Sequence, residues 1–347
     1  MPSLPFRYFT VSVIIPVRNE QEHVVRILEE MNNQDYPVNL MEIIVSDDNS
    51  DDDTMALTSH YSCKHPCFPL VLVYSNDLNI ANSGKKQAII RAIARAKGEV
   101  VICTDADTWH SASWVKTMAN SFRFTEIKMV LGPVVFRTGK NLLQKIQVLE
   151  FMGIMGATCG SAAIGYPVMC NGANLGYRKS AFVEVGGYSS NLKYASGDDQ
   201  FLMSSVRKRY GKGSVVFLFD SLAIVQTEAE STLIGFLQQR FRWVSKSQGY
   251  RDQGVILVGA VTLFTISILF FGMVLGIFLR PILLIAFILW LVKIALDYPI
   301  VHIMVNFSGK LEKPGYYVIS QFFQLIYVPV VSLVGLVFPN RWKGRRI

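Results

Sequence analysis

The chain has 347 residues, enough for two or three domains, and 51% of them are hydrophobic. Together with a mean hydropathy of +0.31, this composition excludes a wholly soluble protein, so part of the chain is expected in lipid. The five cysteines are scattered and odd in number, a pattern compatible with reduced thiols that implies no disulfide framework. The net charge is +8, but the basic clusters at Arg240 to Arg251 and Arg341 to Arg346 flank apolar segments. We therefore expect anionic lipid headgroups, and not nucleic acid, as the partner of these clusters.

Short β-branched runs alternate with helical patterns in the first part of the chain. The expected strands are Val11 to Val17, Glu42 to Ser46, Leu70 to Tyr74 and Glu99 to Thr104, and the expected helices are Gln21 to Met31 and Ser83 to Lys97. This alternation predicts an α/β fold with a mostly parallel sheet. Ligands of such sheets bind at the carboxyl ends of the strands, so the residues after each run are the candidates for a site.

Two polar turns follow the first two predicted strands. Pro16 is expected to end the first strand, and Asn19, beside Glu20, is placed to cap the next helix. After the second strand, Asp47 and Asp48 are either turn and cap residues or acceptors of hydrogen bonds from a base or a ribose. The residue types alone do not separate these alternatives.

An anion site and a carboxylate pair come next. The segment Asn82 to Lys86 opens a helix with Lys85 beside its free amides, an arrangement suited to a diphosphate. It has neither the GxxxxGK[ST] nor the GxGxxG spacing, which argues against a nucleoside triphosphatase or a dinucleotide enzyme. Asp105 and Asp107 follow the fourth strand, one residue apart, where both carboxylates can turn towards one divalent cation.

Two further polar segments lie beyond the DxD pair. The segment Asn171 to Gly176, which includes Asn174, is small and polar, as a backbone that approaches a ligand would be. Asp198 and Asp199 open a helix, where one acid would suffice as a cap. The second acid is therefore a candidate base for an acceptor hydroxyl, and Asp199 fits this role better than Asp198.

An amphipathic helix is expected from Ser231 to Tyr250, and it carries the sequence Gln239-Arg240-Phe241-Arg242-Trp243. Trp and Arg are typical of an interfacial anchor at the level of the headgroups. Alternatively, Trp243 offers a flat face to a sugar ring, while Gln239 and Arg242 reach a diphosphate or sugar hydroxyls.

Three apolar segments follow, at residues 255–279, 281–307 and 316–338, each long enough to span a membrane. The middle one contains Lys293 and Asp297, which lie four residues apart and can pair on one helical face, so it is a span, a re-entrant piece or an interfacial helix. The N-terminus has no stretch of signal-peptide length, so we expect the first domain to be cytoplasmic, at the plasma or inner membrane in a prokaryote. Basic residues on both sides of three spans leave the side of the C-terminus open.

Taken in order, these motifs resemble the inverting glycosyltransferase family 2 with its GT-A fold, in members that carry D, DxD, (E/T)D and Q(Q/R)xRW. The resemblance covers Val11 to Tyr250 and implies a role for each motif. The nucleotide-sugar site would include Pro16, Asn19, Glu20, Asp47, Asp48, Lys85 and Asp105. Asp105 and Asp107 would hold Mg²⁺ or Mn²⁺, and Asp199 would be the catalytic base. The acceptor and diphosphate would be framed by Asn174, Asp198, Gln239, Arg240, Arg242 and Trp243. Asp198 stands where glutamate is usual in the family, so its own role is open.

The resemblance implies two domains, a catalytic domain at 1–250 and a membrane region at 254–347. The expected function is transfer of a sugar from a nucleotide-diphosphate sugar, UDP by default, to a lipid-linked or membrane acceptor. A processive polysaccharide synthase is the alternative, although three spans are few for an export channel. A membrane-anchored nucleotide-sugar binding protein without turnover is the second alternative.

Overall fold

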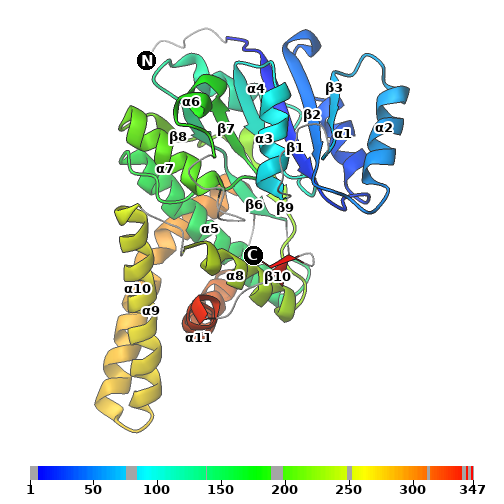
Figure 1. Cartoon of the computed structure of the whole chain (residues 1–347). Coiled ribbons are helices and arrows are strands. Elements are labelled where there is room, and N and C mark those ends of the chain that lie inside the picture. The colour runs from blue at the N-terminus through cyan, green and yellow to red at the C-terminus, as the bar shows by residue number, and fades with distance from the viewer. Residues whose placement is uncertain are drawn as a thin grey trace. The chain divides into compact units, whose positions relative to one another are not determined.

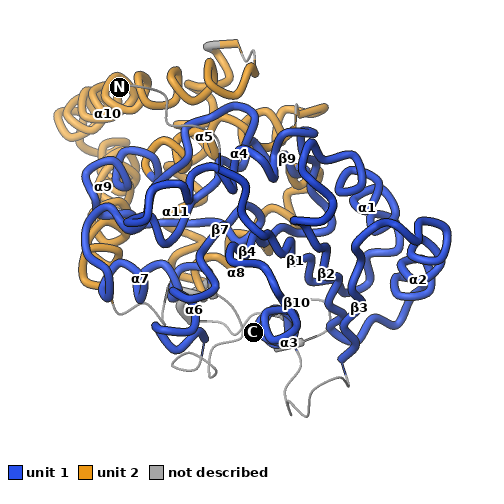
Figure 2. The backbone as a smooth tube through the Cα atoms, turned by 90° about the horizontal axis from the view of Figure 1, so that it is seen from above, with its two compact units in different colours: residues 1–134, 158–228 blue, residues 135–157, 229–347 orange. Residues whose placement is uncertain are grey.

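We describe the protein from a computed structural model, shown in Figure 1. It describes residues 7–75, 84–137, 139–188, 198–247, 252–310, 313–337, 341–342 and 345–346. The chain divides into two compact units, residues 1–134 with 158–228, and residues 135–157 with 229–347 (Figure 2). Each unit is described separately.

A seven-stranded sheet forms the centre of the first unit, in the order β3-β2-β1-β4-β7-β5-β8. Its strands are β1 (Val11–Val17), β2 (Met41–Asp47), β3 (Leu70–Val73), β4 (Val100–Cys103), β5 (Met129–Leu131), β7 (Leu175–Arg178) and β8 (Val215–Phe217). All neighbours pair in parallel except β7, which runs antiparallel to both β4 and β5. The mostly parallel α/β fold predicted from the sequence is confirmed.

Helices cover both faces of this sheet, because each strand is apolar on both sides. On one face lie α1 (Val24–Asn32), α2 (Thr54–Lys64) and α4 (Trp114–Asn120), whose buried side chains pack on alternate residues of β1. On the other face lie α3 (Lys85–Arg95), α6 (Lys179–Glu184) and α7 (Asp198–Tyr210). The first unit is thus a three-layer α/β/α domain with two cores.

The turn after β1 differs from the prediction. Pro16 does not end the strand, which continues to Val17 and pairs Pro16 with Ser46 of β2. The backbone oxygen of Ile14 faces β4, where it accepts a hydrogen bond from the Thr104 amide at 3.1 Å. The backbone groups of a strand alternate in direction, so the backbone nitrogen of Pro16 faces the same side as the Ile14 oxygen. Pro16 lies beyond the last residue of β1 that pairs with β4, so its missing N–H leaves no carbonyl of β4 without a donor.

Asn19 is not the cap of α1, which begins at Val24. Its backbone has a positive φ of 53°, a conformation that asparagine tolerates. Its side-chain oxygen accepts a hydrogen bond from the Asp51 amide at 2.8 Å, and its own amide donates to Ser50 Oγ at 3.1 Å. Asn19 therefore joins the loops that follow β1 and β2.

Long helices dominate the second unit. They are α5 (Leu142–Ala163, shared between the units), α8 (Leu233–Ser247), α9 (Gln253–Gly276), α10 (Arg280–Ser308) and α11 (Pro314–Val337). The remaining strands of the chain are β6 (Val134–Phe136), β9 (Val225–Thr227), and the antiparallel pair β10 (Arg341–Trp342) and β11 (Arg345–Arg346). Helices α8 to α11 lie where the sequence predicts the amphipathic helix and the three apolar segments.

Among the described residues, four helices are long and apolar enough to span a membrane: α5, α9, α10 and α11. Helix α5, whose interior contains Lys145 and Glu150, was not predicted as a span. Helix α5 packs closely on α10, because a Cβ added at Gly156 would lie 2.2 Å from Ile300 Cγ2. Small residues allow such close contacts between apolar helices. In α10, Lys293 donates to Asp297 at 2.7 Å and to Gln321 of α11 at 2.5 Å, which confirms the predicted pair and satisfies the ammonium group.

Candidate active site

Polar side chains gather at the carboxyl edge of the first unit's sheet. Asp47 ends β2, and its carboxylate accepts hydrogen bonds from the Ser50 amide at 3.0 and 3.3 Å, as in an Asx turn. Asp48 is 4% exposed and accepts a hydrogen bond from the Gly84 amide, immediately before α3. Arg18 lies 3.8 Å from the Asp48 carboxylate. Asp48 therefore connects the turn after β2 to the start of α3.

Lys85, the first residue of α3, is at the centre of a group of carboxylates. Its ammonium group pairs with Asp105, which follows β4. Burial opposes the charged form of Lys85, but the carboxylates of Asp105, Asp199 and Asp107 together raise its pKa. The side chain is nonetheless 39% exposed, so the cluster is open to solvent on one side. The structure thus pairs Lys85 with Asp105 and places Asp107 and Asp199 near enough for their charges to act on Lys85, although these residues are distant in the sequence.

Asp199 lies in the first turn of α7. One carboxylate oxygen accepts a hydrogen bond from the Gly172 amide at 3.0 Å, and the other accepts one from the Gln200 amide at 2.9 Å. These two bonds fix the orientation of the carboxylate and leave further lone pairs for a substrate hydroxyl. Asp198 begins the same helix, and its side chain lies outside the part of the chain that the structure describes. The predicted Asn82 and Ser83 also lie outside the described residues.

The chemistry of Asp105 and Asp107 fits a divalent cation. Asp107 is accessible to solvent, yet protein surrounds much of it; this partial burial, with the charges of Asp105 and Glu20, raises the pKa of its carboxyl. An added cation would offset this excess of negative charge. Among the described residues, no three His, Cys, Asp or Glu side chains gather to hold a metal by themselves. The pair therefore suits an ion such as Mg²⁺, which is bound by one or two carboxylates together with substrate phosphates and water.

Glu20 contributes to the site through its charge, and its amide donates to Thr54 Oγ1 at 2.8 Å. Its carboxylate lies 3.0 Å from His23 Nδ1, in the turn that precedes α1. Pro16 and Asn19 set the course of the backbone into this turn.

Asn174, predicted to frame the acceptor and diphosphate, makes several hydrogen bonds within the protein. Its side chain is fully buried beside β7, and every polar group on it has a partner. The oxygen accepts a hydrogen bond from Trp114 Nε1 at 3.1 Å, and the nitrogen donates to the carbonyls of Pro133 and Ala223 at 2.8 Å each. Gly132 lies against this amide, because a Cβ there would be 2.2 Å from Asn174 Cγ. The polar atoms of Asn174 are thus used in hydrogen bonds within the protein, and its contact with a ligand stays a prediction.

We expect Asn174→Ala to lower stability before it affects chemistry. The substitution leaves the buried Trp114 indole N–H without its acceptor and removes the hydrogen bonds to the Pro133 and Ala223 carbonyls, at about 1–3 kcal/mol for each group left unsatisfied. Thermal unfolding of the variant should therefore occur at a markedly lower temperature than that of Asn171→Ala, which removes one partly buried hydrogen bond to the Ala173 amide. Unchanged unfolding with weaker donor binding would instead make Asn174 a ligand contact.

In the second unit, α8 carries the QRFRW sequence, in which Arg240 contacts both Gln239 and Trp243. Arg240 is 4% exposed and pairs with Glu150 of α5 at 2.8 Å. Glu150 also accepts a hydrogen bond from the Tyr327 hydroxyl. The Arg240 guanidinium lies 4.1 Å from the centre of the Trp243 ring, and Gln239 accepts a hydrogen bond from Arg240 at 3.0 Å. One face of the Trp243 ring is thus covered by Arg240.

We expect Arg240→Ala to destabilise the second unit by about 3–5 kcal/mol, because it leaves Glu150 buried without its cation. Thermal unfolding in detergent measures this loss, and Glu150→Ala combined with Arg240→Ala should cost less than the sum of the two single variants. Gln239→Ala, on a half-buried neighbour, is the matched control. If Arg240→Ala unfolds like the parent protein but no longer binds donor, Arg240 contacts the diphosphate directly, as the sequence predicts.

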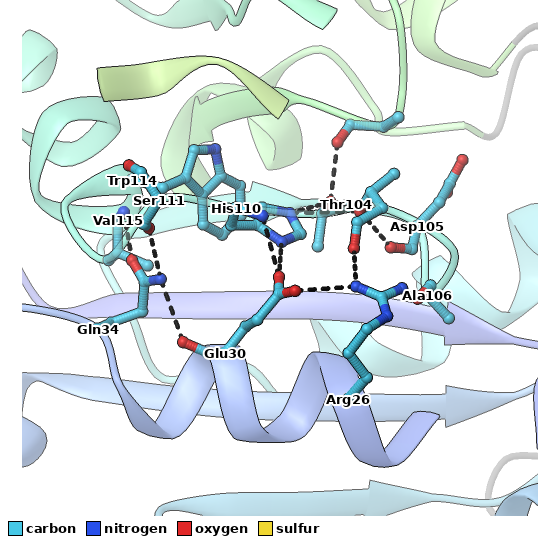
Figure 3. Close-up of polar contacts among 12 residues, drawn as sticks. Arg26, Glu30, Gln34, Thr104, Asp105, Ala106, His110, Ser111, Trp114 and Val115 are labelled. Atoms are coloured by element: carbon cyan, nitrogen blue, oxygen red, sulfur yellow. Dashed lines mark hydrogen bonds and ion pairs between the residues drawn. The ribbon is translucent and has the colours of Figure 1, made fainter. Parts of the chain in front are cut away.

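A polar network that the sequence analysis missed lies beside the DxD pair (Figure 3). Arg26 and Glu30 lie one turn apart on α1 and pair at 2.9 Å. Glu30 also accepts hydrogen bonds from the amide and Nδ1 of His110, at 2.9 and 3.0 Å. The His110 side chain is fully buried, and this burial lowers its pKa, while the neighbouring Glu30 carboxylate opposes the shift. The i, i+4 spacing of Arg26 and Glu30 is visible in the sequence, but the contact with His110 is not.

The three-layer sheet domain, with carboxylates after β2 and β4 and at the start of α7, defines a GT-A-like class of proteins. The model of the family "Glycosyl transferase family 2" matches residues 12–186, and that of "Glycosyl transferase family group 2" matches residues 100–305. The chain belongs to glycosyl transferase family 2, as the sequence motifs predict.

Several characterised proteins are similar to the chain. An N-acetylglucosaminyltransferase of Rhizobium meliloti (strain 1021) is 26% identical over 250 residues, which cover 70% of this chain and 56% of that protein. A poly-beta-1,6-N-acetyl-D-glucosamine synthase of Staphylococcus epidermidis is 28% identical over 52% of this chain and 42% of that protein. A beta-monoglucosyldiacylglycerol synthase of Trichormus variabilis (strain ATCC 29413 / PCC 7937) is 23% identical, over 72% of this chain and 51% of that protein. The chain spans about half the length of these relatives.

Among solved structures, a mannosyltransferase from Pyrobaculum calidifontis, in complex with GDP-Man and Mn²⁺, is similar over 95% of this chain and 88% of that chain. The TM-score is 0.59 at 16% sequence identity, so this likeness supports the fold.

Proposed function

We propose that the protein is a metal-dependent inverting glycosyltransferase that moves a sugar from a nucleotide-diphosphate sugar to a lipid-linked or membrane acceptor. The observation that carries this proposal is the convergence of Asp105, Asp107 and Asp199 on Lys85 at the carboxyl edge of the sheet. The residues proposed to hold the metal and the diphosphate would then share one electrostatic cluster with the candidate base.

In the proposed mechanism the acceptor hydroxyl attacks the anomeric carbon while Asp199 takes its proton. The hydrogen bonds from Gly172 and Gln200 hold the Asp199 carboxylate in a fixed orientation throughout. The bond from the anomeric carbon to the diphosphate oxygen breaks, and Lys85 offers a positive charge to the departing diphosphate. Mg²⁺ or Mn²⁺, held by Asp105 and Asp107, would supply the remaining neutralising charge. Attack from the face opposite the leaving group inverts the anomeric centre.

The apolar helices support a location at the membrane. Four of the described helices are long enough to span a membrane, and basic residues lie around α8 and after α11. These features suit a protein anchored at the cytoplasmic face of the membrane, with its catalytic domain in the cytoplasm. An acceptor that is itself a lipid, or is attached to one, would then lie in the same membrane. The names of the relatives, which include a glycolipid synthase and N-acetylglucosaminyl enzymes, make UDP-N-acetylglucosamine and UDP-glucose the first donors to test.

A processive polysaccharide synthase is the second candidate, since the similar staphylococcal protein is a polymer synthase. The two functions differ in their products. Purified protein in detergent is mixed with Mn²⁺ or Mg²⁺, a panel of UDP- and GDP-sugars and a total lipid extract, and products are analysed by mass spectrometry. One sugar added to one lipid, abolished by EDTA, supports the proposal, and a ladder of products supports the synthase. Donor binding without transfer, with every acceptor tried, would point to a binding protein.

A further inference from the structure

We propose that Arg26 of α1 is a positioning residue for Asp107, because it holds the backbone on both sides of that carboxylate. This inference rests on the proposed function, which makes Asp107 a metal ligand. Arg26 donates one hydrogen bond to the Ala106 carbonyl at 3.1 Å and another to the Thr108 carbonyl at 2.6 Å. These are the peptide carbonyls of the residues immediately before and after Asp107. Figure 3 labels Arg26 and Ala106.

Arg26 is itself fixed from two directions. Its guanidinium pairs with Glu30 at 2.9 Å and lies 4.1 Å from the centre of the Trp109 ring. A planar guanidinium presents several donors in a rigid fork, so one side chain can bridge two carbonyls and a carboxylate together. Arg26 has no contact with the Asp107 carboxylate among the interactions that the structure gives, so its effect on that group runs through the backbone.

Glu30 holds the other end of the loop, at His110. It accepts the hydrogen bonds from the amide and ring of His110, and the other ring nitrogen of His110 lies 2.8 Å from Thr104 Oγ1. Thr104 precedes Asp105, and Thr108 Oγ1 donates to the Asp105 carbonyl at 2.6 Å. Two residues of α1 therefore hold this loop at Ala106, Thr108 and His110, and His110 in turn contacts Thr104 at its start.

This arrangement matters because both metal carboxylates lie on one short loop between β4 and α4. Groups that orient metal ligands typically change metal affinity about 10- to 100-fold when they are removed. We expect Arg26→Lys to weaken Mn²⁺-dependent nucleotide binding by this factor. The positive charge is kept, but an ammonium group lacks the planar fork of donors that a guanidinium presents.

The test compares the parent protein with Arg26→Lys and Glu30→Gln. Lys116→Gln is the matched control, because Lys116 forms an exposed ion pair with Asp35 on the same unit, at 2.6 Å. Hydrogen–deuterium exchange of the peptide that contains residues 104–110 is measured without metal. Calorimetry with UDP or GDP in the presence and absence of Mn²⁺ gives affinities, and thermal unfolding reports stability.

The proposal predicts faster exchange in this peptide for both variants, Mn²⁺-dependent nucleotide binding weakened about 10- to 100-fold, and unfolding temperatures close to that of Lys116→Gln. Unchanged exchange and unchanged affinity in both variants would overturn it. If one variant unfolds at a much lower temperature, the test rests on the other variant, because Arg26 and Glu30 support the loop through separate hydrogen bonds. Failure of the proposed function has a different signature: the parent protein itself would show no Mn²⁺-dependent nucleotide binding.

Discussion

Asp199→Asn is expected to lower the rate of sugar transfer by about 10²- to 10⁴-fold, the typical contribution of a general base. The substitution keeps the size of the side chain but removes the proton acceptor. Donor binding should persist, because Lys85, Asp105 and Asp107 are unchanged. Single-turnover rates with saturating donor and acceptor measure the chemical step, and calorimetry measures donor binding.

A matched control distinguishes a base from a helix cap. Asp220 caps a short helical turn through a hydrogen bond from the Leu222 amide at 2.9 Å and lies outside the carboxylate cluster. Asp220→Asn should therefore transfer sugar at the parent rate. If Asp199→Asn and Asp220→Asn lose the same small fraction of activity, Asp199 is only a cap, and the base must be sought elsewhere.

Asp107→Ala is expected to reduce turnover roughly 100- to 1,000-fold, because a bound cation is worth several kcal/mol of charge stabilisation at the leaving group. The concentration of Mn²⁺ needed for half-maximal activity should rise at the same time. Steady-state rates across a Mn²⁺ titration measure both effects.

The chain provides its own control for this substitution. Asp51 belongs to a second run of aspartates, Asp51 to Asp53, which matches the DxD spacing but lies in the exposed loop before α2. Asp51→Ala should leave the Mn²⁺ dependence unchanged. Equal losses in Asp51→Ala and Asp107→Ala would show that a diffuse negative field, and not a ligand pair, attracts the cation.

Much of the fold could be predicted from the sequence, because hydrophobic periodicity is strong in the first four strands. The exceptions have physical causes. Helix α2 was missed because its buried face consists of Thr54, Thr58 and Tyr61, which do not form an apolar stripe. Helix α5 was missed as a candidate span because Glu150 interrupts it, and the pairing of this residue with Arg240 appears only in three dimensions.

The candidate site was predicted as a set of motifs, but the sequence could not show how their polar atoms are used. Asp48 and Asp105 follow β2 and β4, whose carboxyl ends meet at one sheet edge, so their proximity follows from the topology. Asp199 belongs to the start of α7, and its approach to this edge could not be predicted from the strand order. Asn174 and Arg240 were assigned to ligands, and the structure instead buries both side chains among protein partners. The contacts of Arg26 with the two peptide carbonyls beside Asp107 depend on how α1 packs in the core that it shares with β4. No local sequence pattern predicts this packing.

The measurement that tests the central claim most directly is the anomeric configuration of the product. Proton NMR of the isolated product, made from a donor of known configuration, gives the coupling constant at the new glycosidic centre. A single displacement assisted by Asp199 predicts complete inversion relative to the donor. Retention of configuration would contradict this mechanism and the role assigned to Asp199.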